Sequence, residues 1–278
     1  MCATCGCGND ATAMITVPHD HDHDHGGHHH DHGDSHDHHH DHGADHMHLP
    51  VTETITLEQK ILAKNDLLAR HNRDWLEQRN IVAFNMTSSP GAGKTTLLER
   101  TIGELDEVPI AVIEGDQETL LDAERIKATG CAVVQINTGA GCHLDADMLR
   151  RAFDALAPAP GTLLFIENVG NLVCPALFDL GERSKVVVIS VTEGTDKPLK
   201  YPHMFAAAGL VIVNKTDLLP YVDFDLDKCR EYVRSINPGV EMLPISVTTG
   251  DGMARWYDWL AKERFAASAS LDHVVERA

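Results

Sequence analysis

The 278-residue sequence lacks the features of several common protein classes. It contains no apolar run near the roughly 20 residues that a membrane-spanning helix needs. Its first residues do not join a basic stretch to an apolar one, so we expect no secretory signal, no membrane association and a cytoplasmic location. Lys and Arg total 23 against 42 Asp and Glu, which gives a net charge of −19 with neutral histidines. Because no basic patch is present, we expect no nucleic-acid partner.

The first part of the chain also lacks the residues that build a core. Between residues 19 and 48 there is no Lys or Arg and almost no large aliphatic residue, whereas 15 of the 19 histidines and eight aspartates lie there. Such a segment buries too little apolar surface to offset the entropy lost on ordering. We therefore expect residues 1–51 to form a disordered tail and residues 52–278 to form one folded domain. A capping box at residues 56–59 predicts where its first helix begins.

Short apolar runs alternate with helix-like stretches through residues 52–278. The expected strands are residues 81–84, 110–113, 132–136, 163–166, 186–191, 210–213 and 240–245. The helices expected between and after them are residues 95–105, 119–128, 144–156, 225–236 and 253–265. Continuous apolar strands separated by helices are typical of a parallel sheet that is covered on both faces. The sequence predicts an α/β fold with a mostly parallel sheet of about seven strands.

A phosphate-binding loop follows the first expected strand. Residues 88–96 read Ser-Ser-Pro-Gly-Ala-Gly-Lys-Thr-Thr, which matches the Walker A pattern except that Ser88 takes the first glycine position. Lys94 would reach the β- and γ-phosphates, and Thr95 would ligate Mg²⁺. This strand, loop and helix arrangement indicates a P-loop NTPase. The residues expected to hold the phosphates are Gly91, Ala92, Gly93, Lys94, Thr95 and Thr96.

A guanine signature follows the strand expected at residues 210–213. Residues 214–217 read Asn-Lys-Thr-Asp, and the Asp217 carboxylate can accept hydrogen bonds from N1–H and the 2-amino group of guanine. Adenine offers no such pair of donors, so the carboxylate would stay unpaired. Asn214 would contact the base and tie loops together, Lys215 would lie along the base plane, and Ser246 stands where a backbone contact to the guanine oxygen is expected. GTP and GDP are the predicted ligands.

Carboxylates at two strand ends are candidates for magnesium binding and catalysis. Glu167 ends one strand, and Gly170 can donate its N–H to the γ-phosphate. Asp116 ends another strand at the same expected sheet edge, and we interpret it as a switch residue near Mg²⁺ and the attacking water. The alternative for Asp116 is a solvated carboxylate without such a role. Lys94, Asp116 and Glu167 are the candidate catalytic residues, and slow hydrolysis is expected because Asn171 stands where a catalytic glutamine would be.

Three groups of cysteines and histidines are candidate metal sites. Without an export signal, clustered thiols are better interpreted as metal ligands than as disulfides. Cys2, Cys5 and Cys7 lie within six residues of one another. Three sulfurs and the amine of Cys2 in a plane would suit Ni²⁺, whereas a tetrahedral arrangement would suit Zn²⁺.

The second group is Cys142, His143 and Cys174, which lie in two loops near the expected nucleotide edge. Pairing across a two-fold homodimer would complete a site there, and the nucleotide state could move its ligands. The third group is a store of lower affinity for Ni, Zn or Cu. It consists of His19, His21, His23, His25, His28, His29, His30, His32, His36, His38, His39, His40, His42, His46 and His48.

Together these motifs resemble the HypB family, the SIMIBI-class GTPases that incorporate nickel into [NiFe]-hydrogenase. The resemblance implies GTP-dependent nickel delivery to the hydrogenase large-subunit precursor, dimerisation through the GTPase domain and a zinc-binding partner of the HypA type. It also implies a tight nickel site at Cys2, Cys5 and Cys7, and a weaker interfacial site at the second group. The residues that carry it are Cys2, Cys5 and Cys7, residues 88–95, 114–116, 141–143, 167–175 and 214–217.

Two other functions fit part of these features. The related urease nickel GTPases have Cys-Pro-His at the metal loop, whereas residues 141–143 here read Gly-Cys-His. A nickel storage protein with vestigial nucleotide binding would keep its function after Lys94→Ala. The metal-loop sequence argues against the urease function, and the coexistence of a guanine signature with clustered soft ligands motivates the hydrogenase function.

Overall fold

The computed structural model describes residues 14–16, 51–116, 121–139 and 141–275, and the side chains of residues 59–116, 121–139 and 141–269. The Cys2, Cys5 and Cys7 group lies outside these residues, as does the histidine tract. The disorder expected for residues 1–51 therefore stays a prediction for most of this segment. Residues 14–16 form a short strand instead, and Val51 belongs to a helix. The first helix begins at Val51, one residue before the expected domain boundary.

A sheet forms the centre of the domain, with the strand order β1-β4-β3-β5-β2-β6-β7-β8. Its seven parallel strands confirm the predicted fold class. They are β2 (Val82–Ser88), β3 (Ile110–Asp116), β4 (Ala132–Asn137), β5 (Leu163–Glu167), β6 (Ser184–Ser190), β7 (Ala208–Asn214) and β8 (Glu241–Pro244).

One further strand comes from the segment expected to be a disordered tail. β1 (Met14–Thr16) pairs antiparallel with the outer edge of β4. An edge strand exposes unpaired backbone groups, so even three extended residues can add to it. A run this short carries no periodic signal, and the sequence therefore did not reveal it.

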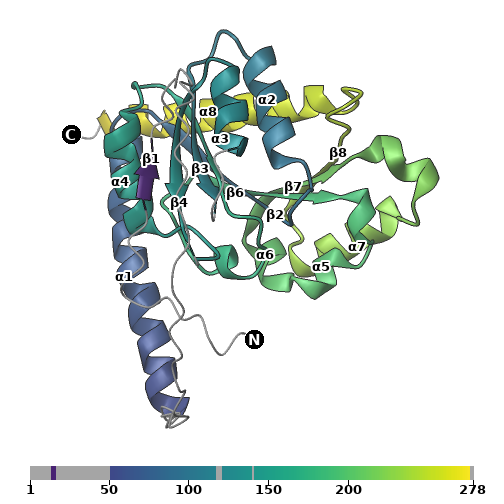
Figure 1. Ribbon diagram of the computed structural model, residues 1–278, viewed down its shortest axis with the longest axis horizontal. Helices are drawn as coiled ribbons and strands as arrows, with labels where there is room; N and C mark the ends of the chain where they lie inside the picture. The colour runs from purple at the N-terminus through teal and green to yellow at the C-terminus, as the bar shows by residue number, and fades with distance from the viewer. Residues whose placement is uncertain (1–13, 17–50, 117–120, 140, 276–278) are drawn as a thin grey trace, which may run out of the picture.

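Helices cover both faces of the sheet, as Figure 1 shows. One apolar layer packs under α2 (Lys94–Glu104), α3 (Leu121–Ala128) and α8 (Met253–Val275). The opposite face packs against α1 (Val51–Glu77), α4 (Ala146–Leu156), α6 (Pro202–Ala207) and α7 (Leu226–Ile236). The remaining helices are short: α5 (Lys197–Lys200), η1 (Cys174–Ala176), η2 (Val191–Glu193) and η3 (Thr216–Tyr221).

The first helix begins earlier than the sequence predicted. α1 starts at Val51, so the capping box expected at residues 56–59 is wrong because these residues lie inside the helix. Pro50 directly precedes Val51. Proline is tolerated at the start of a helix and breaks its interior, so Pro50 marks the start better than the Thr and Glu pattern does.

The loops with candidate functional residues all leave the sheet at its carboxyl edge. They follow β2, β3, β4, β5 and β7. Ligands of open α/β sheets gather at this edge, close to points where the connections from two neighbouring strands run to opposite faces of the sheet. The described part of the chain contains no helix long and apolar enough to cross a bilayer.

Substituting Trp256 by Ala should destabilise the domain strongly. Its ring is fully buried, stacks on Trp259 at 5.7 Å, and donates from Nε1 to Thr101 Oγ1 at 3.0 Å. We expect the free energy of unfolding in urea to fall by about 3–5 kcal/mol, because the cavity adds to the lost transfer energy. Phe265→Ala on the same helix is the control; its ring is 78% exposed, so the loss should stay within about 0.5 kcal/mol. Equal losses would contradict this account of the core.

Candidate nucleotide and metal site

The loop after β2 has the backbone of a phosphate cradle. Gly91 and Gly93 have φ angles of 74° and 99°, in the left-handed region that favours glycine. A Cβ on Gly93 would lie 2.5 Å from Nδ2 of Asn214, so a side chain is excluded there. α2 begins at Lys94, which points the free N–H groups of its first turn into the loop.

The contacts of Ser88 explain why it replaces the first glycine of the strict Walker A pattern. Its hydroxyl accepts a hydrogen bond from Lys94 Nζ at 2.7 Å and donates to the carbonyl of Ser89 at 2.6 Å. Lys94 Nζ also lies 3.9 Å from Glu167 Oε1. The buried ammonium is thus held in the loop by a hydroxyl that glycine could not supply.

A pocket of about 540 Å³ opens beside this loop. The predicted residues that line it are Gly91, Gly93, Lys94, Thr95, Thr96, Asp116, Glu167, Gly170 and Lys215, together with Cys142 of the metal group. The structure thereby brings the phosphate-loop residues, both strand-end carboxylates and a thiol to one cavity. Ala92, Asn214, Asp217 and Ser246 are not among its lining residues.

The guanine signature is tied directly to the phosphate loop. Asn214 Nδ2 donates to the carbonyl of Ala92 at 2.9 Å, and Lys215 Nζ donates to the carbonyl of Gly91 at 2.7 Å. Asn214 Oδ1 accepts from the N–H of Val247 at 3.2 Å. The Ser246 hydroxyl donates to Asp217 Oδ1 at 2.6 Å, which orients the carboxylate. The predicted loop-tying role of Asn214 therefore has a geometric basis.

Two buried carboxyls near the pocket each keep one oxygen without a hydrogen-bond partner among the described residues. Thr95 Oγ1 donates to Glu167 Oε1 at 2.7 Å, while Oε2 is left over. Burial raises the pKa of Glu167, and nearby Lys94 and the Thr95 hydrogen bond oppose this. Burial, followed by the charges of Glu167 and Asp116, raises the pKa of Glu114 to about 9. Unpaired buried carboxyl oxygens beside a threonine hydroxyl fit a hard divalent cation such as Mg²⁺.

The structure also brings the second cysteine and histidine group together. Cys142 Sγ lies 3.0 Å from Cys174 Sγ and 3.6 Å from His143 Nδ1. One ligand atom from each residue lies within 4.8 Å of the others. Burial lowers the pKa of His143, more than Asp145 raises it, which favours the neutral imidazole that binds metals. Two thiols and one imidazole suit nickel or zinc and leave at least one coordination position for another ligand.

Several residues at the site were not found from the sequence. Asp122 and Arg125 of α3 also line the pocket, and Arg125 donates to Thr96 Oγ1 at 3.2 Å. Phe178 packs its ring against His143, with ring centroids 3.9 Å apart. No motif marks these residues, because only the packing of separate segments brings them to the site.

Comparison with known proteins identifies the family of the chain. Residues 82–244 match the family model "CobW/HypB/UreG, nucleotide-binding domain". The chain is 56% identical over 213 residues to the hydrogenase maturation factor HypB of Escherichia coli K12, covering 76% of this chain and 73% of that protein.

Two solved structures are similar. HypB from Archaeoglobus fulgidus superposes with a TM-score of 0.68 at 40% identity, covering 73% of this chain and 99% of that one. HypB from Helicobacter pylori, solved in complex with nickel, gives a TM-score of 0.69 at 36% identity, covering 73% of this chain and 96% of that one. The chain therefore belongs to the HypB family of hydrogenase maturation factors and contains their nucleotide-binding domain.

Proposed function

We propose that the protein is a GTP-hydrolysing nickel metallochaperone that supports nickel insertion into the [NiFe]-hydrogenase large-subunit precursor. The observation that carries the proposal is the position of Cys142. This metal-group thiol lines the same pocket as Lys94 and Thr95 of the phosphate loop. Binding or loss of the γ-phosphate can therefore affect the position of a metal ligand that lies in the same pocket.

Guanine selection would come from Asp217, which accepts from the two donors on the base edge. The phosphates would lie on the backbone N–H groups after Gly91, with Lys94 moving from Ser88 to the β- and γ-phosphates. Gly170 packs against Pro90 of the phosphate loop, where an added Cβ would lie 3.0 Å from the proline ring. The backbone of Gly170 is thus close to the phosphate loop, and its N–H would donate to a bound γ-phosphate.

Thr95 and Glu167 would hold Mg²⁺, with Asp116 close to it and to the attacking water. The cation would neutralise charge that develops on the phosphates. Because Glu167 must be ionised for this, its nearest cation, Lys94, helps by favouring the carboxylate. We expect hydrolysis to be slow, since the described residues offer no glutamine beside Gly170 to orient water.

Cys142, His143 and Cys174 would bind nickel, or zinc in its place, at the interface of a homodimer whose second copy supplies further ligands. The relative from Helicobacter pylori was solved with nickel, which supports this choice of cargo. Cys2, Cys5 and Cys7 would form a tighter nickel site, and the histidine tract would store nickel. A HypA-type zinc-binding protein and the large-subunit precursor are the proposed partners in the cytoplasm. The family assignment favours this function over a urease-type factor or a storage protein.

Lys94→Ala should reduce GTP hydrolysis by about 100-fold or more, because a buried charge aimed at the phosphates is lost. Single-turnover phosphate release measures this rate. Lys200→Ala is the control, because Lys200 is exposed on α5 and pairs only with Asp196 in the described part of the chain. A Lys94→Ala protein with the wild-type rate would exclude the proposed GTPase mechanism.

Asp217→Asn should weaken GTP binding by about 10- to 100-fold, because the amide presents a donor to the guanine 2-amino group. Xanthosine triphosphate has a carbonyl at this position, so its binding should improve. Competition against a fluorescent nucleotide measures both affinities. Asp223→Asn, an exposed aspartate six residues further along the chain, should leave both unchanged. Unaltered base preference in Asp217→Asn would contradict the assignment of the guanine site.

Cys142→Ser or Cys174→Ser should abolish the thiolate-to-metal charge-transfer absorption of the nickel-loaded domain. The measurement uses the full chain with Cys2, Cys5 and Cys7 changed to Ser, which removes the other thiol cluster.

The matched control is Cys131→Ser in the same background. Burial raises the pKa of Cys131 to about 11, and its thiol donates to the carbonyl of Ile110 at 3.3 Å, so it should contribute no metal-binding thiolate. Absorption that survives both site variants, or that disappears in Cys131→Ser, would show that the metal is bound by other thiols than Cys142 and Cys174.

A further inference from the structure

A cluster of polar side chains is buried on one face of the sheet, and one of its members, Asn168, also lines the nucleotide pocket. Asn85 on β2 and Asn168 after β5 are only 0% and 2% exposed, and Glu182 and Lys185 are buried beside them. In the β2–β6 register, Asn85 is the neighbour of Lys185. Polar groups in an apolar core are costly unless they are hydrogen-bonded. Their contacts therefore show what the cluster holds in place.

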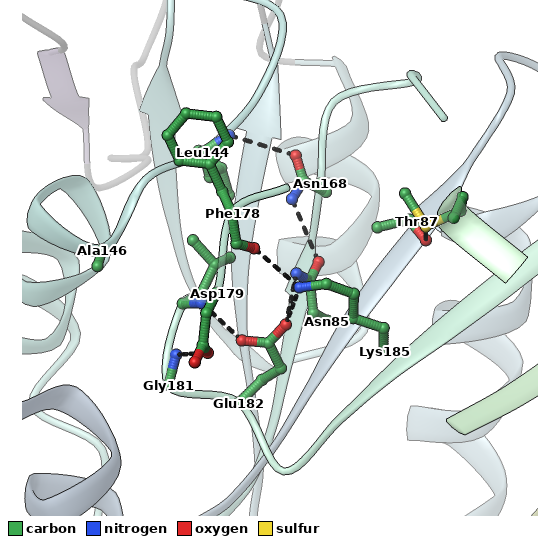
Figure 2. A network of polar contacts seen from close by, with 12 residues as sticks. Asn85, Thr87, Leu144, Ala146, Asn168, Phe178, Asp179, Gly181, Glu182 and Lys185 are labelled. Atoms are coloured by element: carbon green, nitrogen blue, oxygen red, sulfur yellow. Dashed lines mark hydrogen bonds and ion pairs between the residues drawn. The ribbon is translucent and has the colours of Figure 1, made fainter. Parts of the chain in front are cut away.

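Asn168 lies at the centre of this cluster and uses both ends of its amide, as Figure 2 shows. Its Oδ1 accepts from the N–H of Leu144 at 3.3 Å, and its Nδ2 donates to Asn85 Oδ1 at 3.2 Å. Asn85 Nδ2 in turn donates to Glu182 Oε1 at 3.1 Å. Two branches thus leave Asn168, one to the loop after β4 and one to the segment before β6.

The first branch reaches the Cys142 and His143 loop through Leu144, the next residue. The Leu144 side chain fills the space over Gly115 of β3, where an added Cβ would lie 2.9 Å from its methyl groups. Leu144 is therefore fixed by Asn168 at its backbone and by the end of β3 at its side chain. Asn171 adds a hydrogen bond from its Nδ2 to the carbonyl of Cys142 at 3.2 Å.

The second branch reaches the segment that follows Cys174. Lys185 Nζ pairs with Glu182 Oε1 and donates to the carbonyl of Phe178 at 2.8 Å. Glu182 Oε2 accepts from the N–H of Leu180 at 2.7 Å. Because the Phe178 ring packs on His143, this branch also ends at the metal group.

We propose that Asn168 is a positioning residue that transmits the state of the phosphate-facing loop, residues 167–170, to both segments of the Cys142, His143 and Cys174 group. The inference rests on the proposed function. Asn168 directly follows Glu167, and its own N–H is bonded to the carbonyl of Met86 at 2.9 Å. A reorientation of the loop on γ-phosphate binding cannot be absorbed within a close-packed interior, so it must shift Leu144 or Asn85.

Asn65 on α1 provides a matched comparison. It is 5% exposed, accepts from the N–H of Ala146 at 3.0 Å and donates to the carbonyl of Asp179 at 2.7 Å. It therefore holds the same two segments as Asn168 does. Within the described part of the chain its side chain bonds to Asp179 and Ala146 and not to residues 167–170, so it can position the metal ligands but should not report on the nucleotide.

The test measures Co²⁺ affinity in the full chain with Cys2, Cys5 and Cys7 changed to Ser. The thiolate-to-cobalt charge-transfer band is followed with bound GDP and with bound non-hydrolysable GTP analogue. The ratio of the two dissociation constants reports the coupling. For the unaltered site we expect a ratio of about fivefold or more, as is common for coupled sites.

Asn168→Ala should bring this ratio to within about twofold of one. Asn85→Ala should also reduce it, although Asn85 lines neither the nucleotide pocket nor the metal group, and this variant remains informative if Asn168→Ala does not fold. Asn65→Ala should weaken Co²⁺ binding by a common factor in both states and leave the ratio unchanged.

The outcomes distinguish a failure of the proposed function from a failure of the positioning role of Asn168. Equal affinities in both nucleotide states of the unaltered site would overturn the proposed function and this inference with it. An undiminished ratio in both Asn168→Ala and Asn85→Ala would overturn the positioning role alone. A ratio lost equally in Asn65→Ala would also overturn it, because any loosening of the segments would then suffice.

Discussion

The pairing of β5 with β2 is the constraint on which the site depends. In this register Glu167 lies opposite Met86, and the Asn168 N–H continues the ladder to the Met86 carbonyl at 2.9 Å. Glu167 therefore meets Thr95 at the start of α2, while Asn168 faces Asn85 on the other side of the sheet. A slip of one residue would exchange these two faces and leave a carboxylate in the polar cluster instead of beside the phosphate loop.

The site also contains groups that the fold alone does not satisfy. Glu114 and Glu167 are buried close to each other, and each keeps an oxygen without a partner among the described side chains. Such an arrangement costs free energy in the empty protein, and a bound cation would relieve it. By contrast, the asparagine and lysine cluster on the opposite face is fully connected, which suits a structural connection better than a ligand site.

The sequence predicted the parts of this architecture that are encoded locally. The phosphate loop, the guanine signature and the apolar strands are short contiguous patterns, and in the structure the first two directly follow β2 and β7 at the carboxyl edge of the sheet. The sequence predicts too late a start for α1, because a capping pattern at Thr56 competes with Pro50. β1, Arg125 and the contacts of Asn85 with Glu182 could not be predicted, since they depend on which distant segments pack together. In the sequence Ser88 is only a departure from the Walker A pattern, and its hydrogen bond with Lys94 gives the physical reason for it.

The metal-bearing segments are held from two sides by different kinds of support. Asn65 and Asn72 of α1 bind the backbone at Ala146 and before β6, and the described side chains of this helix do not line the phosphate pocket. Asn168 binds the neighbouring Leu144 from the loop that faces the phosphates. If α1 acts as the fixed side, a shift of the phosphate-facing loop must appear as relative movement between the two thiols and the imidazole. Because metal affinity depends steeply on ligand geometry, a small displacement there suffices to change it.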